Sequence, residues 1–129
     1  MRLLKGCIWF LVFAAVLHTA VGLAIYGDAL HGLLVGGVGP AEAPRFDRLA
    51  ALWFMFSGLL MFAIAGLSLW VIRKTGALPI FLGIAFLAFA LVGGLVLPVS
   101  GFWLFIPPGL GIVAHALKGA RPGPRAELG

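Results

Sequence analysis

Among the side chains able to do chemistry, His18 is the one whose position invites it. It lies in the uncharged run 6–27, about 18 Å along a helix from Gly6 and so close to the middle of a membrane-spanning helix. An ionisable residue at that depth indicates a functional site facing other helices. The alternative is structural, with neutral imidazole hydrogen-bonded to a backbone carbonyl, to Ser57 or to Ser68 on another helix.

The remaining metal-ligating side chains do not complete a site. His31 follows the first apolar run, His115 lies near the end of the last, and Cys7 is a lone cysteine. Three histidines at three depths predict no metal cluster and no pair of haem ligands within one chain. A single cysteine allows no intrachain disulfide. We therefore predict no cofactor; quinone, or haem held between two copies through His18, remains open.

A second group of polar residues lies in the connection 28–48. A catalytic acid–base set is one interpretation of it, and ordinary capping and interfacial charge is the other. The group consists of Asp28, His31, Glu42, Arg45, Asp47 and Arg48.

Composition limits the class of protein that positions these residues. The chain has 129 residues, 63% of them hydrophobic and only 10% charged. Soluble domains are about 25% charged, so there is too little polar surface here for a water-soluble globule. The net charge of +5 forms no basic stripe typical of nucleic-acid binding, so no nucleic-acid partner is expected.

The uncharged runs predict four membrane spans in one domain, 1–117. The runs 6–27 and 49–72 are each long enough to cross a bilayer core of about 30 Å. The uncharged stretch 75–117 would be about 65 Å long as one helix, so it must fold back. Pro98 and Ser100-Gly101 predict the turn, which leaves spans at about 77–97 and 102–117.

Three local features refine this picture. Asp28 is placed to cap a short interfacial helix within 28–48, and Asp47 to cap the second span. Pro107-Pro108 predicts a kink inside the fourth helix. The tail 118–129 is expected to be disordered and cytoplasmic. A cleavable signal peptide ending near Gly22-Leu23-Ala24 is the alternative for the first run.

Basic residues predict the orientation. An N-terminus inside the cell places seven of them on the inner side (Arg2, Lys5, Arg73, Lys74, Lys118, Arg121 and Arg125) and two on the outer side (Arg45 and Arg48). The positive-inside rule then favours four spans with both termini in the cytoplasm. The aromatic residues agree, with Trp9 and Trp70 at inner ends and Tyr26, Trp53 and Trp103 at outer ends.

The chain resembles a family of small bacterial four-helix membrane proteins catalogued as a domain of unknown function. The resemblance covers about 6–117. It rests on His18-Thr19 with Gly22, Phe46-Asp47-Arg48 with Trp53-Phe54 and Gly58, and Pro98-Val99-Ser100-Gly101-Phe102-Trp103. It implies four helices in the bacterial inner membrane and no assigned activity. In outline the chain is also similar to DoxX-like proteins, some of which associate with quinone-linked respiration.

These observations predict an all-α four-helix membrane bundle that is more consistent with a binding protein than with an enzyme. The first hypothesis is that a hydrophobic ligand or a partner membrane protein binds within the bundle, at His18, Thr19, Ser57 and Trp53. The second is an enzyme or electron-transfer subunit acting on a lipid or quinone. The third is a transporter, which would require a homo-oligomer because one chain has few polar residues in its spans.

Overall fold

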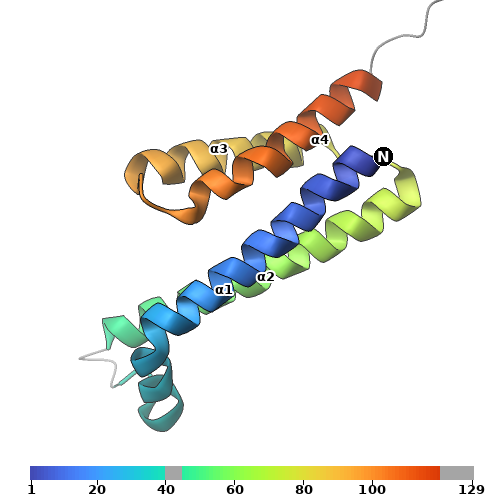
Figure 1. Cartoon of the computed structure of the whole chain (residues 1–129). Helices are drawn as coiled ribbons and strands as arrows, with labels where there is room; N and C mark the ends of the chain where they lie inside the picture. The colour runs from blue at the N-terminus through green and yellow to red at the C-terminus, as the bar shows by residue number, and fades with distance from the viewer. Residues whose placement is uncertain (40–44, 120–129) are drawn as a thin grey trace, which may run out of the picture. The chain divides into compact units, whose positions relative to one another are not determined.

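The computed structural model describes residues 1–39 and 45–119, which form helices joined by short connections. The elements are α1 (Arg2–Gly36), α2 (Phe46–Thr75), α3 (Ile80–Val96), a 3-10 helix η1 (Gly101–Phe105) and α4 (Ile106–Gly119) (Figure 1). This confirms the predicted all-α class. The chain divides into two units, which are described separately: one joins Met1–Phe10 to the chain from Ser68 onward, and the other is Leu11–Leu67.

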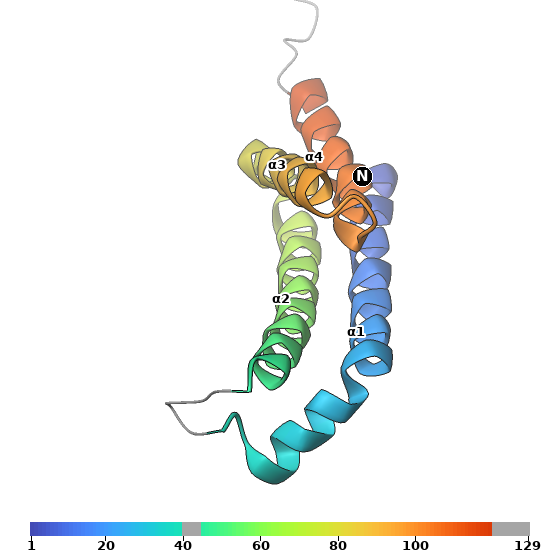
Figure 2. The ribbon, with the colours of Figure 1, turned by 90° about the vertical axis from the view of Figure 1, so that its left-hand side faces the viewer.

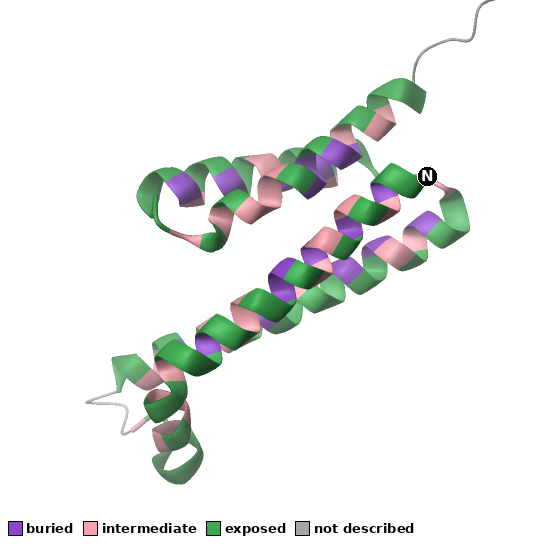
Figure 3. Ribbon diagram, in the orientation of Figure 1, coloured by how far each residue is buried: buried purple, intermediate pink, exposed green. Residues whose placement is uncertain are grey.

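Two of the helices are long and apolar enough to cross a membrane, α1 with 35 residues and α2 with 30. Much of their surface is exposed (Figure 3), and the exposed side chains include Phe13, Leu59 and Leu60. Such side chains match a hydrocarbon environment better than water. α3 is also apolar but has 17 residues, about 26 Å by helical rise.

α1 continues through the position where a separate interfacial helix was predicted. Asp28 lies inside the helix and therefore caps no new one. The helix ends at Gly36, and the next residue, Gly37, has a φ of 60°, which glycine favours, and its N–H donates to the carbonyl of Leu33. The last turns of α1 bend away from its earlier axis (Figure 2).

α2 also begins earlier than the uncharged run suggests. The carbonyl of Arg45 accepts hydrogen bonds from the N–H groups of Arg48 and Leu49, so Arg45 occupies the capping position. Asp47 lies in the first turn rather than at the cap predicted for it. A carboxylate there still faces the positive end of the helix dipole.

α3 and α4 are joined by a tight turn and η1. Ser100 caps η1: its hydroxyl accepts from the N–H of Phe102 and donates to the carbonyl of Leu97. Pro107 and Pro108 lie in the first turn of α4, where no intrahelical partner is needed for the missing N–H groups. Instead of the predicted kink inside one helix, the structure has a change from 3-10 to α-helix just before the prolines.

Glycines set the contacts within the unit that contains α3 and α4. A methyl group on Gly83 would lie 2.9 Å from the carbonyl oxygen of Gly109, so the two backbones touch. At Gly111, the Sγ of Cys7 fills the space that a side chain would take. The first turns of α1 therefore pack against α4. Of the predicted disordered tail, Lys118 and Gly119 belong to α4, and the rest lies outside the described residues.

Candidate functional site

The imidazole of His18 is held against α2 by two contacts with one residue. Its Nε2 lies 2.9 Å from the carbonyl oxygen of Phe54, and its ring stacks on the Phe54 ring with centroids 3.9 Å apart and planes 7° from parallel. Tyr26 lies two turns further along α1, and its ring centroid is 5.3 Å from that of the same phenylalanine. The site therefore joins α1 to α2 inside the unit Leu11–Leu67.

The hydrogen bond fixes the state of the histidine ring. A carbonyl oxygen only accepts, so the hydrogen must be on Nε2, and in the neutral ring Nδ1 is then an acceptor. Nδ1 has no hydrogen-bond partner among the described residues, and His18 is only half-buried. Among the described residues, every fully buried side-chain nitrogen or oxygen has a hydrogen-bond partner. Since Nδ1 has none, it is not fully buried and reaches the molecular surface.

Small residues allow this close approach of the two helices. A methyl group on Gly58 would lie 2.9 Å from Thr19 Oγ1 and 3.2 Å from His18 Cδ2. One on Gly22 would lie 2.8 Å from the Phe54 ring. Thr19 itself donates to the carbonyl of Ala15 at 2.9 Å within α1. The missing side chain of Gly58 therefore leaves room for His18 and Thr19, and that of Gly22 leaves room for the Phe54 ring.

Two of the residues predicted to share the site lie elsewhere on α2. Ser57 is exposed, and its hydroxyl donates to the carbonyl of Trp53 within the same helix. Trp53 is 67% exposed and meets Phe56 edge to face at 6.2 Å. The partner of His18 is thus a backbone carbonyl and not Ser57, and of the four predicted residues the structure brings His18 and Thr19 together.

Arg48 has a structural task at the end of α1. Its NH1 donates to the carbonyl of Gly37 at 2.7 Å. A methyl group on Gly32 would lie 2.9 Å from its Nε, and one on Gly36 would lie 3.1 Å from its NH1. The guanidinium group therefore lies along the glycine face of the last turns of α1, where a cation is favoured by the helix dipole.

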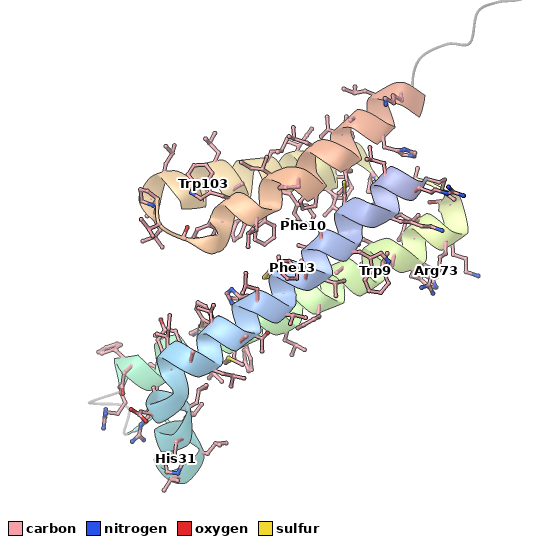
Figure 4. The ribbon with its side chains drawn as sticks, viewed as in Figure 1. Trp9, Phe10, Phe13, His31, Arg73 and Trp103 are labelled. Atoms are coloured by element: carbon pink, nitrogen blue, oxygen red, sulfur yellow. The ribbon has the colours of Figure 1, made fainter. Side chains whose placement is uncertain are left out.

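The other members of the predicted outer cluster separate. Arg45 pairs with Asp47 through two contacts of 3.2 Å, both side chains about half exposed. This hydrogen bond with Arg45 lowers the pKa of Asp47, which lies outside the predicted span 49–72. Asp28 and His31 are exposed, and neither makes an ion pair within the described ranges; His31 lies on the last turns of α1 (Figure 4). Glu42 falls outside those ranges.

The two candidate sites do not combine into one chemical centre. His18 contacts α2 at Phe54, which lies about 10 Å of helical rise beyond Asp47. In residues 1–39 and 45–119, no group of three histidine, cysteine or acidic side chains is placed to hold a metal ion. What remains at His18 is one surface acceptor, Nδ1, on a rigidly held ring.

Sequence reasoning missed Phe54 and Gly58 as the contact surface of His18. A signal was available, because Gly58 follows Phe54 by one helical turn and leaves its carbonyl uncovered. It also missed the packing of Arg48 on Gly32 and Gly36, which stand four residues apart and so form one face of α1.

Comparison with known proteins places the chain in a family. No curated protein and no solved structure matches it. The model of a family of unknown function, DUF6463, matches residues 3–119 and therefore includes all four α-helices and the His18 contact. The chain belongs to this family of unknown function, DUF6463.

Proposed function

We propose that the protein is a four-span protein of the bacterial inner membrane with both termini in the cytoplasm. α1 and α2 supply two spans of sufficient length and apolarity. α3, and η1 followed by α4, supply two shorter apolar segments linked by a tight turn. The excess of arginine and lysine at the proposed inner ends of the spans supports this orientation.

Within that membrane domain, the protein binds a hydrophobic ligand or a partner span that carries a hydrogen-bond donor. The observation that carries this proposal is the surface-accessible Nδ1 of His18, fixed as an acceptor by the bond from Nε2 to Phe54. A hydrogen-bond acceptor facing hydrocarbon lacks water as a partner, which makes a donor from another molecule favourable there. Hydroxyl and amide groups satisfy this requirement, whereas a carbonyl group does not.

The geometry favours binding over catalysis. The ring is held by a stack and a hydrogen bond, and Thr19 is engaged with Ala15 within its own helix. Of the outer charged side chains, Arg45 and Asp47 pair with one another, and Arg48 caps α1. None of the described contacts of His18 links it to a nucleophile or to a carboxylate, so no observation favours the enzyme or the transporter over a binding protein.

Native mass spectrometry of the gently extracted protein tests this proposal. In the wild type we expect a bound molecule of defined mass or a bound partner chain. His18→Phe retains an aromatic ring for the stack on Phe54 but removes both nitrogens, and should lose the ligand. His18→Gln keeps a donor at the ε position for the Phe54 carbonyl but removes the ring, and with it both the stack and the Nδ1 acceptor, and should weaken the ligand about tenfold through the lost hydrogen bond.

Ser57→Ala is the matched control, because Ser57 is a nearby polar residue of α2 that does not contact His18. It should leave both ligand and stability unchanged. The proposal is wrong if the His18 variants change only the free energy of unfolding while every associated molecule stays bound. His18 would then be a structural residue.

A further inference from the structure

Positive side chains gather at one end of the unit that joins Met1–Phe10 to the chain from Ser68 onward. The first turn of α1, the last turn of α2 and the last turn of α4 lie toward the same side of this unit in Figure 1. Within the same unit, Cys7 of α1 packs against Gly111 of α4. We define the basic end as Arg2, Lys5, Arg73, Lys74 and Lys118.

These charges are not neutralised within the described part of the unit. Residues 1–10 and 68–119 contain no aspartate or glutamate. The single ion pair in the described ranges, Arg45 with Asp47, belongs to the other unit, and none of the five cations forms a hydrogen bond there. Four of the five side chains are exposed, and Lys5 is half-buried. Five like charges that have no acidic partner among the described residues of this unit produce a positive potential that attracts anions.

Aromatic residues indicate where these cations lie with respect to a bilayer. Trp9 is 58% exposed and Trp70 is 57% exposed, each within one turn of a member of the basic end. Trp9 and Arg73 come from α1 and α2 and are both found near this end (Figure 4). Exposed tryptophans at helix ends are typical of the headgroup layer, so the membrane placement proposed above puts these cations near the depth of lipid phosphates.

We propose that the basic end binds the headgroups of anionic phospholipids in the membrane leaflet around it. Phosphate oxygens accept hydrogen bonds from guanidinium and ammonium groups, and arginine can bind them through two parallel bonds. The acyl chains would lie along exposed apolar side chains of the same helices, such as Leu3 and Trp9. This inference depends on the membrane placement proposed above and is independent of any ligand at His18.

Lipid titration of the full chain, with native mass spectrometry as the readout, tests the proposal. The probes are dioleoylphosphatidylglycerol and dioleoylphosphatidylcholine, added separately to the protein in a neutral detergent. We expect tighter binding of the anionic lipid, weakening with salt. Arg73→Gln should weaken it about fivefold and Arg73→Gln with Lys74→Gln about 25-fold, because each basic residue near an anionic surface contributes about 1 kcal/mol.

Arg45→Gln is the matched control, since it also removes one exposed arginine, but from the proposed outer side. It should change affinity for the anionic lipid less than twofold. Equal affinity for the two lipids, or an equal loss in Arg45→Gln and Arg73→Gln, would overturn the proposal. So would displacement of the lipid by equimolar inorganic phosphate, which would indicate a site for the free anion. The His18 variants should bind the anionic lipid normally.

Discussion

Replacing Gly58 by alanine would add a methyl group at the place where His18 meets α2. The new carbon would lie 2.9 Å from Thr19 Oγ1 and 3.2 Å from His18 Cδ2, both closer than an ordinary van der Waals contact. The ring cannot move freely, because it is stacked on Phe54 and bonded to that residue's carbonyl. The clash can be relieved in two ways. Either the His18 ring moves, which lengthens its hydrogen bond to Phe54, or α1 moves away from α2.

Gly66 provides a control on the same helix. Nothing lies within 4 Å of the carbon that alanine would add there. Glycine inside a helix costs about 0.5–1 kcal/mol relative to alanine, and this gain applies to both substitutions. The difference in free energy of unfolding between Gly58→Ala and Gly66→Ala therefore gives the cost of the steric clash at Gly58, which we expect to be about 1–3 kcal/mol.

The measurement is the free energy of unfolding in detergent micelles, followed by helicity as a denaturing detergent is added. Gly66→Ala should be neutral or stabilising, and Gly58→Ala destabilising. Adding Thr19→Ala removes the nearest clashing atom, so the cost of Gly58→Ala should fall in the Thr19→Ala background, giving a coupling of about 1 kcal/mol. Equal stabilities of the two alanine variants, or no coupling to Thr19, would refute the close contact described here.

Two further substitutions test other contacts. Gly83→Ala should destabilise the protein by about 1–3 kcal/mol more than Gly66→Ala, because the added carbon meets the backbone carbonyl of Gly109 at 2.9 Å and a backbone atom cannot turn aside; the same unfolding titration measures it. Arg48→Gln should remove the donor to the Gly37 carbonyl and speed amide hydrogen exchange in the last turn of α1, with unchanged rates in α3 as the internal reference.

The helical class could be predicted from the sequence because long uncharged runs have few alternatives in a membrane. The ends of helices were harder to predict. Charges mark where a chain leaves hydrocarbon, but a helix continues as long as its backbone permits. α1 therefore passes through Asp28 to Gly36, and α2 begins at Phe46, before the uncharged run.

The contact face of each helix was also hard to predict. A helix that is apolar all round has no amphipathic stripe to show which side is buried. Ser57 and Gly58 are neighbours in sequence, yet about 100° apart around α2. One is exposed and the other is buried against His18 and Thr19. The sequence left a backbone carbonyl, Ser57 and Ser68 open as partners of His18, and it could not single out the carbonyl of Phe54, because any residue type supplies a carbonyl.

The two nitrogens of His18 explain why the structural and functional interpretations do not exclude each other. Nε2 joins α1 to α2 through the Phe54 carbonyl, which fixes the ring and its hydrogen. Because the ring is fixed, Nδ1 has a defined direction and a defined role as acceptor, which is what a selective binding site needs. Loss of stability in His18→Phe alone therefore decides nothing. The two variants are decisive together, because His18→Phe retains the stack, His18→Gln retains the hydrogen bond, and both remove the ring acceptor.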